Sequence, residues 1–158
     1  MSTKNSYILG IESSCDETAV AIVDVCLDEQ ENVKAQVRAA KVLSQIETHR
    51  AYGGVIPEVA SREHYDMLPK LVDDCVQSLG VELHTVTRVA ATVSPGLVGG
   101  LLVGSVYAKH FAAGLGVPFS GVVVADFVGR VTVWIDEMNG FVSVGEIAGK
   151  ISNDGGGG

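Results

Sequence analysis

The segment from residue 7 to residue 25 constrains the fold more than any other part of the chain. Residues 7–11 and 19–25 are apolar runs typical of buried strands. The turn between them carries carboxylates and hydroxyls, from Glu12, Asp16, Glu17, Ser13, Ser14 and Thr18. Such groups at the mouth of a hairpin can hold a magnesium ion and turn backbone N–H groups toward phosphate oxygens. The residues alone leave two interpretations open, a nucleotide or metal-phosphate site and an ordinary acidic surface turn.

The apolar pattern after this hairpin predicts further strands and helices. Strands are expected at residues 33–43, 86–93 and 119–125, and helices at 57–79 and 97–115. Pro57 is a favoured first-turn residue, Gly80 closes the first helix, and Pro69 should kink or divide it. Three hairpin-linked strands followed by alternating helix and strand predict an α/β layer with a mixed sheet.

Composition limits size, partners and location. A chain of 158 residues makes one domain the default. The net charge of −8 leaves no basic field that could hold RNA unaided. The three cysteines are scattered and form no C-x-x-C pair, which favours a reducing, cytoplasmic location and argues against a structural zinc site.

One stretch could be mistaken for a membrane span, because residues 89–108 carry no formal charge. Pro95 and Gly96 divide it into a strand-like part and a helix-like part, so no membrane span is predicted. Glycine and alanine recur at every fourth position from 100 to 112, which lets a helix lie close on a sheet.

Three segments together resemble a known family. Residues 10–18 read GIESSCDET, residues 49–64 read HRAYGGVIPEVASREH, and residues 94–104 read SPGLVGGLLVG. In order and spacing they resemble the blocks of the tRNA threonylcarbamoyladenosine transferases, also known as the O-sialoglycoprotein endopeptidase or glycoprotease family. The resemblance covers about residues 7 to 122. It implies a single ribonuclease H-like lobe, as found in actin, sugar kinases and heat-shock ATPases. We therefore expect an actin-like lobe at residues 1–122 and a divergent tail at 123–158 that ends in a glycine-rich stretch.

The resemblance also implies a nucleotide or substrate cleft. Its expected residues are Glu12, Ser13, Asp16, Glu17, Ser94, Gly96, Glu58 and Arg62. Ser94 stands where the family more often has glycine. Gly96 begins a strand–turn–helix joint, which suits either an anion at the helix amino end or a plain tight turn. Arg62 could pair with a carboxylate such as Glu12 or contact a substrate phosphate. His49 and His64 match no compact pair of metal ligands.

The family's catalytic metal pattern is missing. Its H-x-E-G-H histidines align with Val124 and Val128, and valine cannot ligate a metal. The family uses a divalent metal, iron or zinc, and an ATP-derived threonylcarbamoyl-adenylate; no cofactor is expected for this chain alone. The resemblance thus implies a truncated or diverged transferase for threonylcarbamoyladenosine at tRNA position 37, without activity alone. A tRNA partner is expected only in an intact complex, where other chains or a missing lobe supply positive surface.

Two alternatives stay open. The chain could be a non-catalytic interaction module that forms a heterodimer with a same-fold companion subunit, through the helices at 58–79 and 97–115. It could also be a non-functional gene remnant that exposes apolar surface and aggregates. A protease role has little support, because no nucleophile–base pair stands out.

Overall fold

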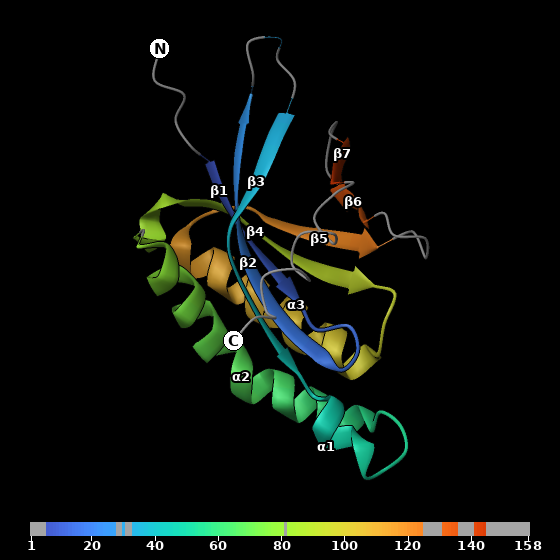
Figure 1. Cartoon of the computed structure of the whole chain (residues 1–158). Helices are drawn as coiled ribbons and strands as arrows, with labels where there is room; N and C mark the ends of the chain where they lie inside the picture. The colour runs from blue at the N-terminus through green and yellow to red at the C-terminus, as the bar shows by residue number, and fades with distance from the viewer. Residues whose placement is uncertain are drawn as a thin grey trace, which may run out of the picture.

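The structure, a computed structural model, describes residues 6–27, 30, 33–80 and 82–124, together with the backbone of strands at 131–135 and 141–144. Figure 1 shows the arrangement of the elements. In chain order they are β1 (Ser6–Glu12), β2 (Glu17–Leu27), β3 (Val33–Ser44), α1 (Ile46–Arg50), α2 (Pro57–Leu79), the short 3₁₀ helix η1 (Leu83–Thr85), β4 (Val86–Ser94), α3 (Val98–Leu115), β5 (Phe119–Val124), β6 (Val131–Ile135) and β7 (Phe141–Val144).

The strands form one mixed sheet in the order β3-β2-β1-β4-β5-β6-β7. β1 pairs in parallel with β4, and β4 in parallel with β5, whereas the other neighbours are antiparallel. Parallel neighbours need a crossover connection, and α2 and α3 lie in the connections that lead to β4 and β5. The predicted α/β layer with a mixed sheet is confirmed.

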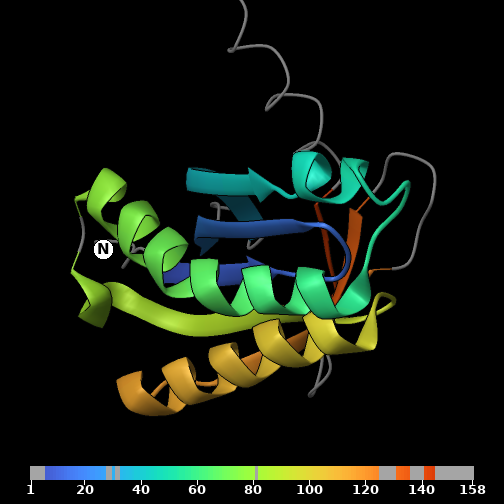
Figure 2. The ribbon, with the colours of Figure 1, turned by 90° about the horizontal axis from the view of Figure 1, so that it is seen from below.

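One apolar core lies between the sheet and the two long helices. Alternate residues of the strands face it, and small or branched side chains of α2 and α3 fill the other side; the cluster includes Leu9, Ile11, Val20, Ile22, Val89, Leu68, Leu71, Val72, Cys75, Ala108 and Ala112. α2 packs on β2 and β3, while α3 packs on β4, β1 and β5. Figure 2 shows the two helices side by side in front of the strands.

The helix boundaries agree with the sequence prediction to within one residue. α2 runs from Pro57 to Leu79 and is capped by Gly80, whose φ of 66° is a left-handed conformation that favours glycine. Pro69 lies inside α2 without dividing it. The predicted close packing of α3 is also confirmed, since its buried residues are Gly100, Gly104, Ala108 and Ala112. Within the described part of the chain, no helix combines the length and apolar character needed to cross a membrane.

The structure adds elements that the sequence pattern did not predict. α1 and η1 are only five and three residues long, so neither carries a readable helical period. The backbones of β6 and β7 extend the sheet beyond β5, in the part of the chain expected to be a divergent tail. The predicted strand at 119–125 corresponds to β5, which ends at Val124. Ala125 lies outside the described residues.

Candidate functional site

The acidic turn, defined as residues 12–17, lies at one edge of the sheet beside the amino end of α3. β1 and β4 are parallel neighbours, so their carboxyl ends meet at this edge, where open α/β sheets usually bind ligands. The backbone N–H of Leu97 donates to the Ser14 carbonyl at 2.7 Å. A Cβ on Gly96 would lie 2.5 Å from that same oxygen, so the close approach of the two loops requires glycine at position 96.

Glu12 ties the turn to β4. One oxygen of its carboxylate accepts the backbone N–H of Ser14 at 2.6 Å, and the other accepts the hydroxyl of Thr92. Both carboxylate oxygens are therefore used inside the protein. The expected alternative, an ion pair between Glu12 and Arg62, does not occur among the described residues.

Ser13 ties the turn to α3. Its side chain is only 1% exposed, and its hydroxyl donates to the Gly100 carbonyl at 2.8 Å. A Cβ on Gly100 would overlap the Ser13 carbonyl oxygen and would come within 3.1 Å of the His64 ring. Three parts of the chain, the turn, α2 and α3, thus meet at Gly100.

The second family-like segment is held under the turn by buried polar groups. His64 is fully buried, and its Nε2 lies 3.0 Å from the Cys15 carbonyl oxygen. Its Nδ1 lies 2.7 Å from the Thr18 hydroxyl and 3.3 Å from Gln45 Nε2. His49, also buried, contacts Gln45 Oε1 through Nε2 at 3.0 Å. Gln45 links the two rings, and no motif in the sequence pointed to it.

The predicted site residues divide into two groups. The turn residues and the joint before α3 lie together, as the bond between Leu97 and Ser14 requires; they are Glu12, Ser13, Asp16, Glu17, Ser94 and Gly96. Glu17, Ser94 and Gly96 are exposed and Asp16 is half-buried. Glu58 and Arg62 are exposed on the first turns of α2, and no described bond joins either to the turn.

The described residues do not fit a metal centre. No group of three or more histidine, cysteine or acidic side chains among them is close enough to hold an ion. The ring nitrogens of His49 and His64 all contact protein groups. Val124, one of the two aligned histidine positions, is the last residue of β5, and Val128 lies outside the described residues.

Cys15 is an exposed free thiol in the turn. Desolvation raises its pKa above the ordinary value, and the neighbouring carboxylates of Asp16 and Glu12 add to the rise. The thiol therefore holds its proton at neutral pH. This environment is the opposite of the electropositive surroundings that activate a nucleophilic cysteine.

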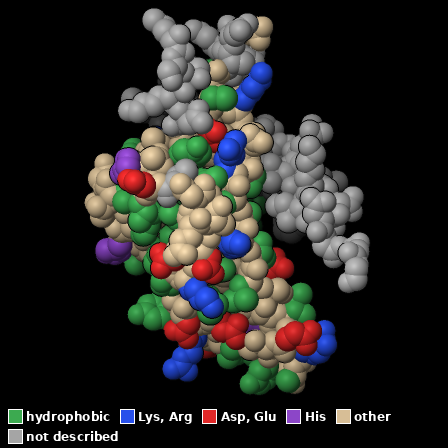
Figure 3. Space-filling view, turned by 60° about the vertical axis from the view of Figure 1, so that its left-hand side comes forward, with side chains coloured by type: hydrophobic (Ala, Val, Ile, Leu, Met, Phe, Trp, Pro, Cys, Tyr) green, Lys and Arg blue, Asp and Glu red, His purple; other side chains and the backbone are tan. Residues whose placement is uncertain are grey.

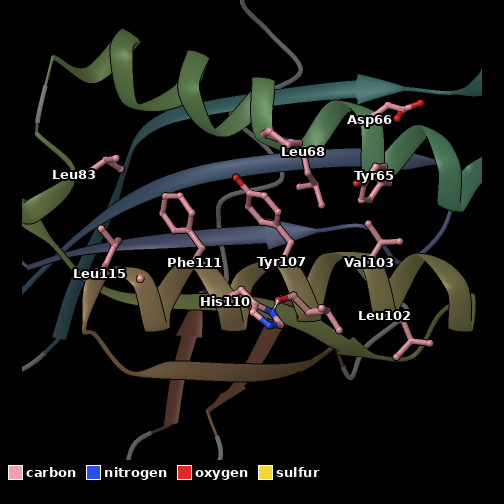
Figure 4. Close-up of a pocket in the computed structure, with 13 residues that line it drawn as sticks. Tyr65, Asp66, Leu68, Leu83, Leu102, Val103, Tyr107, His110, Phe111 and Leu115 are labelled. Carbon is pink, nitrogen blue, oxygen red and sulfur yellow. Dashed lines mark hydrogen bonds between the residues drawn. The ribbon is translucent and has the colours of Figure 1, made fainter.

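A groove of about 970 Å³ lies between α2 and α3, and none of its lining residues belongs to the acidic turn. Figure 4 shows the side chains that line it, with Tyr107 and Phe111 of α3 directed toward α2. Their rings stack at a centroid distance of 5.8 Å. Beside them Leu102 is 56% exposed and Val106 47% exposed, which is unusual for apolar residues one helical turn apart.

The charged side chains form no continuous field on the face shown in Figure 3. There, lysine and arginine side chains of the described residues are interspersed with carboxylates. This mixture agrees with the net charge of −8 and provides no basic track for a nucleic-acid backbone on that face.

Comparisons with known proteins give a consistent result. The model of the family described as tRNA N6-adenosine threonylcarbamoyltransferase matches residues 36–128. The proteins of that name from Corynebacterium aurimucosum and Rhodospirillum rubrum are 49% and 45% identical over 115 residues. Each match covers 73% of this chain and 31% of the relative, so the chain spans less than a third of the length of these curated relatives.

A solved structure supports the fold. The structure described as YeaZ from Pseudomonas aeruginosa matches with a TM-score of 0.50 and 16% identity, covering 89% of this chain and 65% of that one. With the order and directions of the strands, this likeness confirms the predicted ribonuclease H-like lobe.

Proposed function

Because the chain belongs to the tRNA N6-adenosine threonylcarbamoyltransferase family, we propose that it serves the modification of adenosine 37 in tRNA. In this proposal the chain supplies one wall of the cleft in which a threonylcarbamoyl group passes from its adenylate to N6 of the adenosine. We place the boundary of the contributing lobe near residue 122. The free, scattered cysteines suit a reducing compartment, and we place the protein in the cytoplasm.

One observation carries the proposal: the three family-like segments, far apart in sequence, meet around the acidic turn. Leu97 of the third segment bonds to Ser14 of the first, and His64 of the second bonds to Cys15. An ordinary surface turn does not need two other segments to hold its carbonyl groups. A turn that positions a ligand does need such support, because a bound group must meet its partners in a fixed geometry.

Burial suggests a division of labour within the turn. Glu12 and Ser13 use their side chains inside the protein, so we assign them to the frame of the site. Asp16, Glu17, Ser94 and Gly96 remain accessible, so we assign them to the ligand side. Glu58 and Arg62 lie further along α2 and would meet the larger substrate.

We propose that the chain alone has no transferase activity. In the family a divalent metal polarises the threonylcarbamoyl carbonyl, in the Lewis-acid role. The described residues do not fit such a metal. Incubation with threonylcarbamoyl-adenylate and tRNA should give no product, and turnover above background would contradict this part of the proposal.

A chimera tests the positive part of the proposal. Residues 1–122 of this chain would replace the corresponding segment of the Corynebacterium aurimucosum protein, whose matched part is 49% identical. We expect the chimera to form threonylcarbamoyladenosine in tRNA when supplied with threonylcarbamoyl-adenylate. The unmodified relative is the control for assay conditions. A chimera that folds, judged by circular dichroism, yet forms no product would overturn the proposed function.

We further propose that the groove between α2 and α3 binds a companion subunit of the same fold. The exposed apolar residues Leu102 and Val106 at its rim, with Tyr107 and Phe111 inside, support this assignment. The surface matches the helices named from sequence, 58–79 and 97–115. It lies apart from the acidic turn, so one lobe could bind companion and substrate at the same time.

Co-elution tests whether the chain binds a companion subunit of the same fold. The chain would be mixed with YeaZ from Pseudomonas aeruginosa, a protein of similar fold, and analysed by size-exclusion chromatography with light scattering. Leu102→Lys should abolish the complex, whereas Leu27→Lys, an equally exposed apolar position on β2, should leave it intact. No complex with the unchanged chain would exclude the interaction. Aggregation of a chain that never yields a monomer would favour the gene-remnant alternative.

A further inference from the structure

The buried groups beneath the acidic turn form a hydrogen-bond chain whose direction can be assigned at every step. A backbone N–H can only donate, so Ile56 donates to Nδ1 of His49, at 3.3 Å. The proton of His49 is then on Nε2, which donates to Gln45 Oε1 at 3.0 Å. The neutral ring of His49 is thereby fixed in one tautomer.

Gln45 continues the chain of hydrogen bonds to His64, with the same order of donor and acceptor. Its amide nitrogen lies 3.4 Å from the Ala60 carbonyl oxygen. Because a carbonyl oxygen can only accept a hydrogen bond, the NH2 group of the amide must face it, and this fixes which end of the amide is nitrogen. The same nitrogen faces His64 Nδ1 at 3.3 Å. Nδ1 is therefore an acceptor, and the Thr18 hydroxyl also donates a hydrogen bond to it, at 2.7 Å.

His64 ends the chain at the turn. With Nδ1 unprotonated, its Nε2 carries the proton and donates to the Cys15 carbonyl at 3.0 Å. The next residue is held by the same pair, because the Gln45 backbone N–H donates to the Asp16 carbonyl at 2.8 Å. Two successive carbonyls of the turn thus point inward, toward His64 and Gln45.

No hydrogen bond or ion pair from another described residue reaches the ring nitrogens of His49 and His64. The charged residues nearest in sequence on the surrounding elements are Asp16 and Glu17 at the turn, Glu47 and Arg50 on α1, and Arg62 and Glu63 on α2. No carboxylate among the described residues lies within 4.0 Å of the His49 or His64 nitrogens. On α3, Gly100 lies next to the His64 ring.

We propose that His64, oriented by Gln45, is a positioning residue that fixes the conformation of the acidic turn through its Nε2–H bond to the Cys15 carbonyl. That the fixed turn then binds substrate rests on the proposed function, whereas the role of His64 in holding the turn rests on this geometry alone. His64 lies on α2 and is fully buried, and its bonds go to Thr18, Gln45 and the Cys15 carbonyl, so it acts through the turn and not on a ligand.

Two substitutions separate the two sides of the ring. Asparagine places its amide near the position of Nδ1, so His64→Asn keeps an acceptor for Thr18 but loses the donor to Cys15. Glutamine reaches the position of Nε2, so His64→Gln keeps that donor and loses the acceptor. Both remove the ring, but glutamine is one methylene longer than asparagine and fills more of the vacated space. A purely structural role of the ring would therefore disturb Thr18 as much as residues 15–17 in His64→Asn, whereas the positioning role leaves the Thr18 bond of that variant in place.

The measurement is solution NMR on the full chain. In the unchanged protein, long-range ¹H–¹⁵N spectra should show the Nε2–H tautomer for both His49 and His64. His64→Asn should shift the amide signals of residues 15–17 and speed their hydrogen exchange about tenfold, while His64→Gln leaves them close to the unchanged protein. His84→Asn, at a histidine whose side chain is 75% exposed, is the control.

Several results would overturn the positioning role. An Nδ1–H tautomer at His64 would do so without any variant, even if neither variant folded. Equal shifts at residues 15–17 in both variants, or none in either, would also do so. Adding AMP with Mg²⁺ separates this proposal from the proposed function. Turn signals that ignore AMP while the variants behave as expected would contradict the nucleotide site and leave the positioning role intact.

Discussion

Two regions of α3 are built on opposite principles: the rigid side, where its first turn packs on the acidic turn, and the adaptable side, where it lines the groove. On the rigid side, Gly100 has no room for a methyl group, and the buried Ser13 hydroxyl has its partner. Along the groove, Leu102 is half exposed and Gly114, in the last turn of α3, has open space around its Cα. The first side fixes one geometry, and the second leaves apolar surface available to another molecule. A single helix thus joins a rigid site to an adaptable surface, and substitutions on its two sides should have different consequences.

The largest difference is expected from one substitution made on each side. Gly100→Ala should lower the free energy of unfolding by about 1–3 kcal/mol, because the new methyl group would overlap the Ser13 carbonyl oxygen. Gly114→Ala should raise it by up to about 1 kcal/mol, because alanine favours the helix and meets no neighbour. Urea unfolding followed by circular dichroism measures both. Equal stability of the two variants would show that the turn and α3 are not closely packed in solution.

A smaller difference is expected when only a hydrogen bond is removed. Ser13→Ala should cost about 1–2 kcal/mol, because it leaves the buried Gly100 carbonyl without the Ser13 hydroxyl. Ser105→Ala, on the same helix, should change stability by less than about 0.5 kcal/mol, because its hydroxyl makes only a long contact of 3.4 Å within the helix. The same unfolding experiment applies. A neutral Ser13→Ala would mean that water replaces the lost bond.

The sequence predicted that α3 packs closely, but it did not predict all the groups against which α3 packs. The four-residue spacing of glycine and alanine from 100 to 112 predicted close packing, and all four residues are buried. The sequence indicated packing on the sheet, but it did not reveal that Gly100 packs on the acidic turn and on His64. Periodicity identifies which face of a helix is buried, but the neighbour on that face comes from the tertiary fold.

Buried polar residues were the least predictable part. Gln45 is 1% exposed and joins His49 to His64, yet a single glutamine between a strand and a helix carries no pattern. His64, which matched no compact pair of metal ligands in the sequence, is fully buried and bonded on both ring nitrogens. Sequence distance hides such contacts, because Thr18, Gln45 and His64 meet only after the strands and α2 have assembled.

On the adaptable side, substitutions should leave stability almost unchanged. Leu102→Ser should alter the free energy of unfolding by less than about 0.5 kcal/mol, because the side chain is already half exposed. Unfolding should be measured at two protein concentrations tenfold apart. A loss above this limit that grows with concentration would show that the groove is filled by a second copy of the chain, since association makes stability depend on concentration.

The smallest effect concerns the exposed thiol on the rigid side. Desolvation, followed by the nearby carboxylates of Asp16 and Glu12, raises the pKa of Cys15 above its ordinary value. Only the thiolate reacts with iodoacetamide, so alkylation of Cys15 in the folded chain should rise at higher pH than in the urea-unfolded chain. Because the folded pKa is raised, the ionisation of Cys15 leaves the free energy of unfolding unchanged below the unfolded pKa and lowers it as pH rises from the unfolded pKa through the folded one.

Trypsin leaves Cys15 and Cys26 together in the peptide of residues 5–34, so fragment-ion spectra of that peptide distinguish them, whereas Cys75 lies in another peptide. The alkylation rate can then be followed at each site. Asp16→Asn removes one of the nearby carboxylates and should move the Cys15 profile part of the way toward the unfolded one, because desolvation, the larger cause, remains. Identical profiles for folded and unfolded chains would mean that the turn is open to water on all sides. The rigid side would then owe its order to Gly100 and His64 alone, and the surroundings of residues 15–17 would be no more constrained than the rim of the groove.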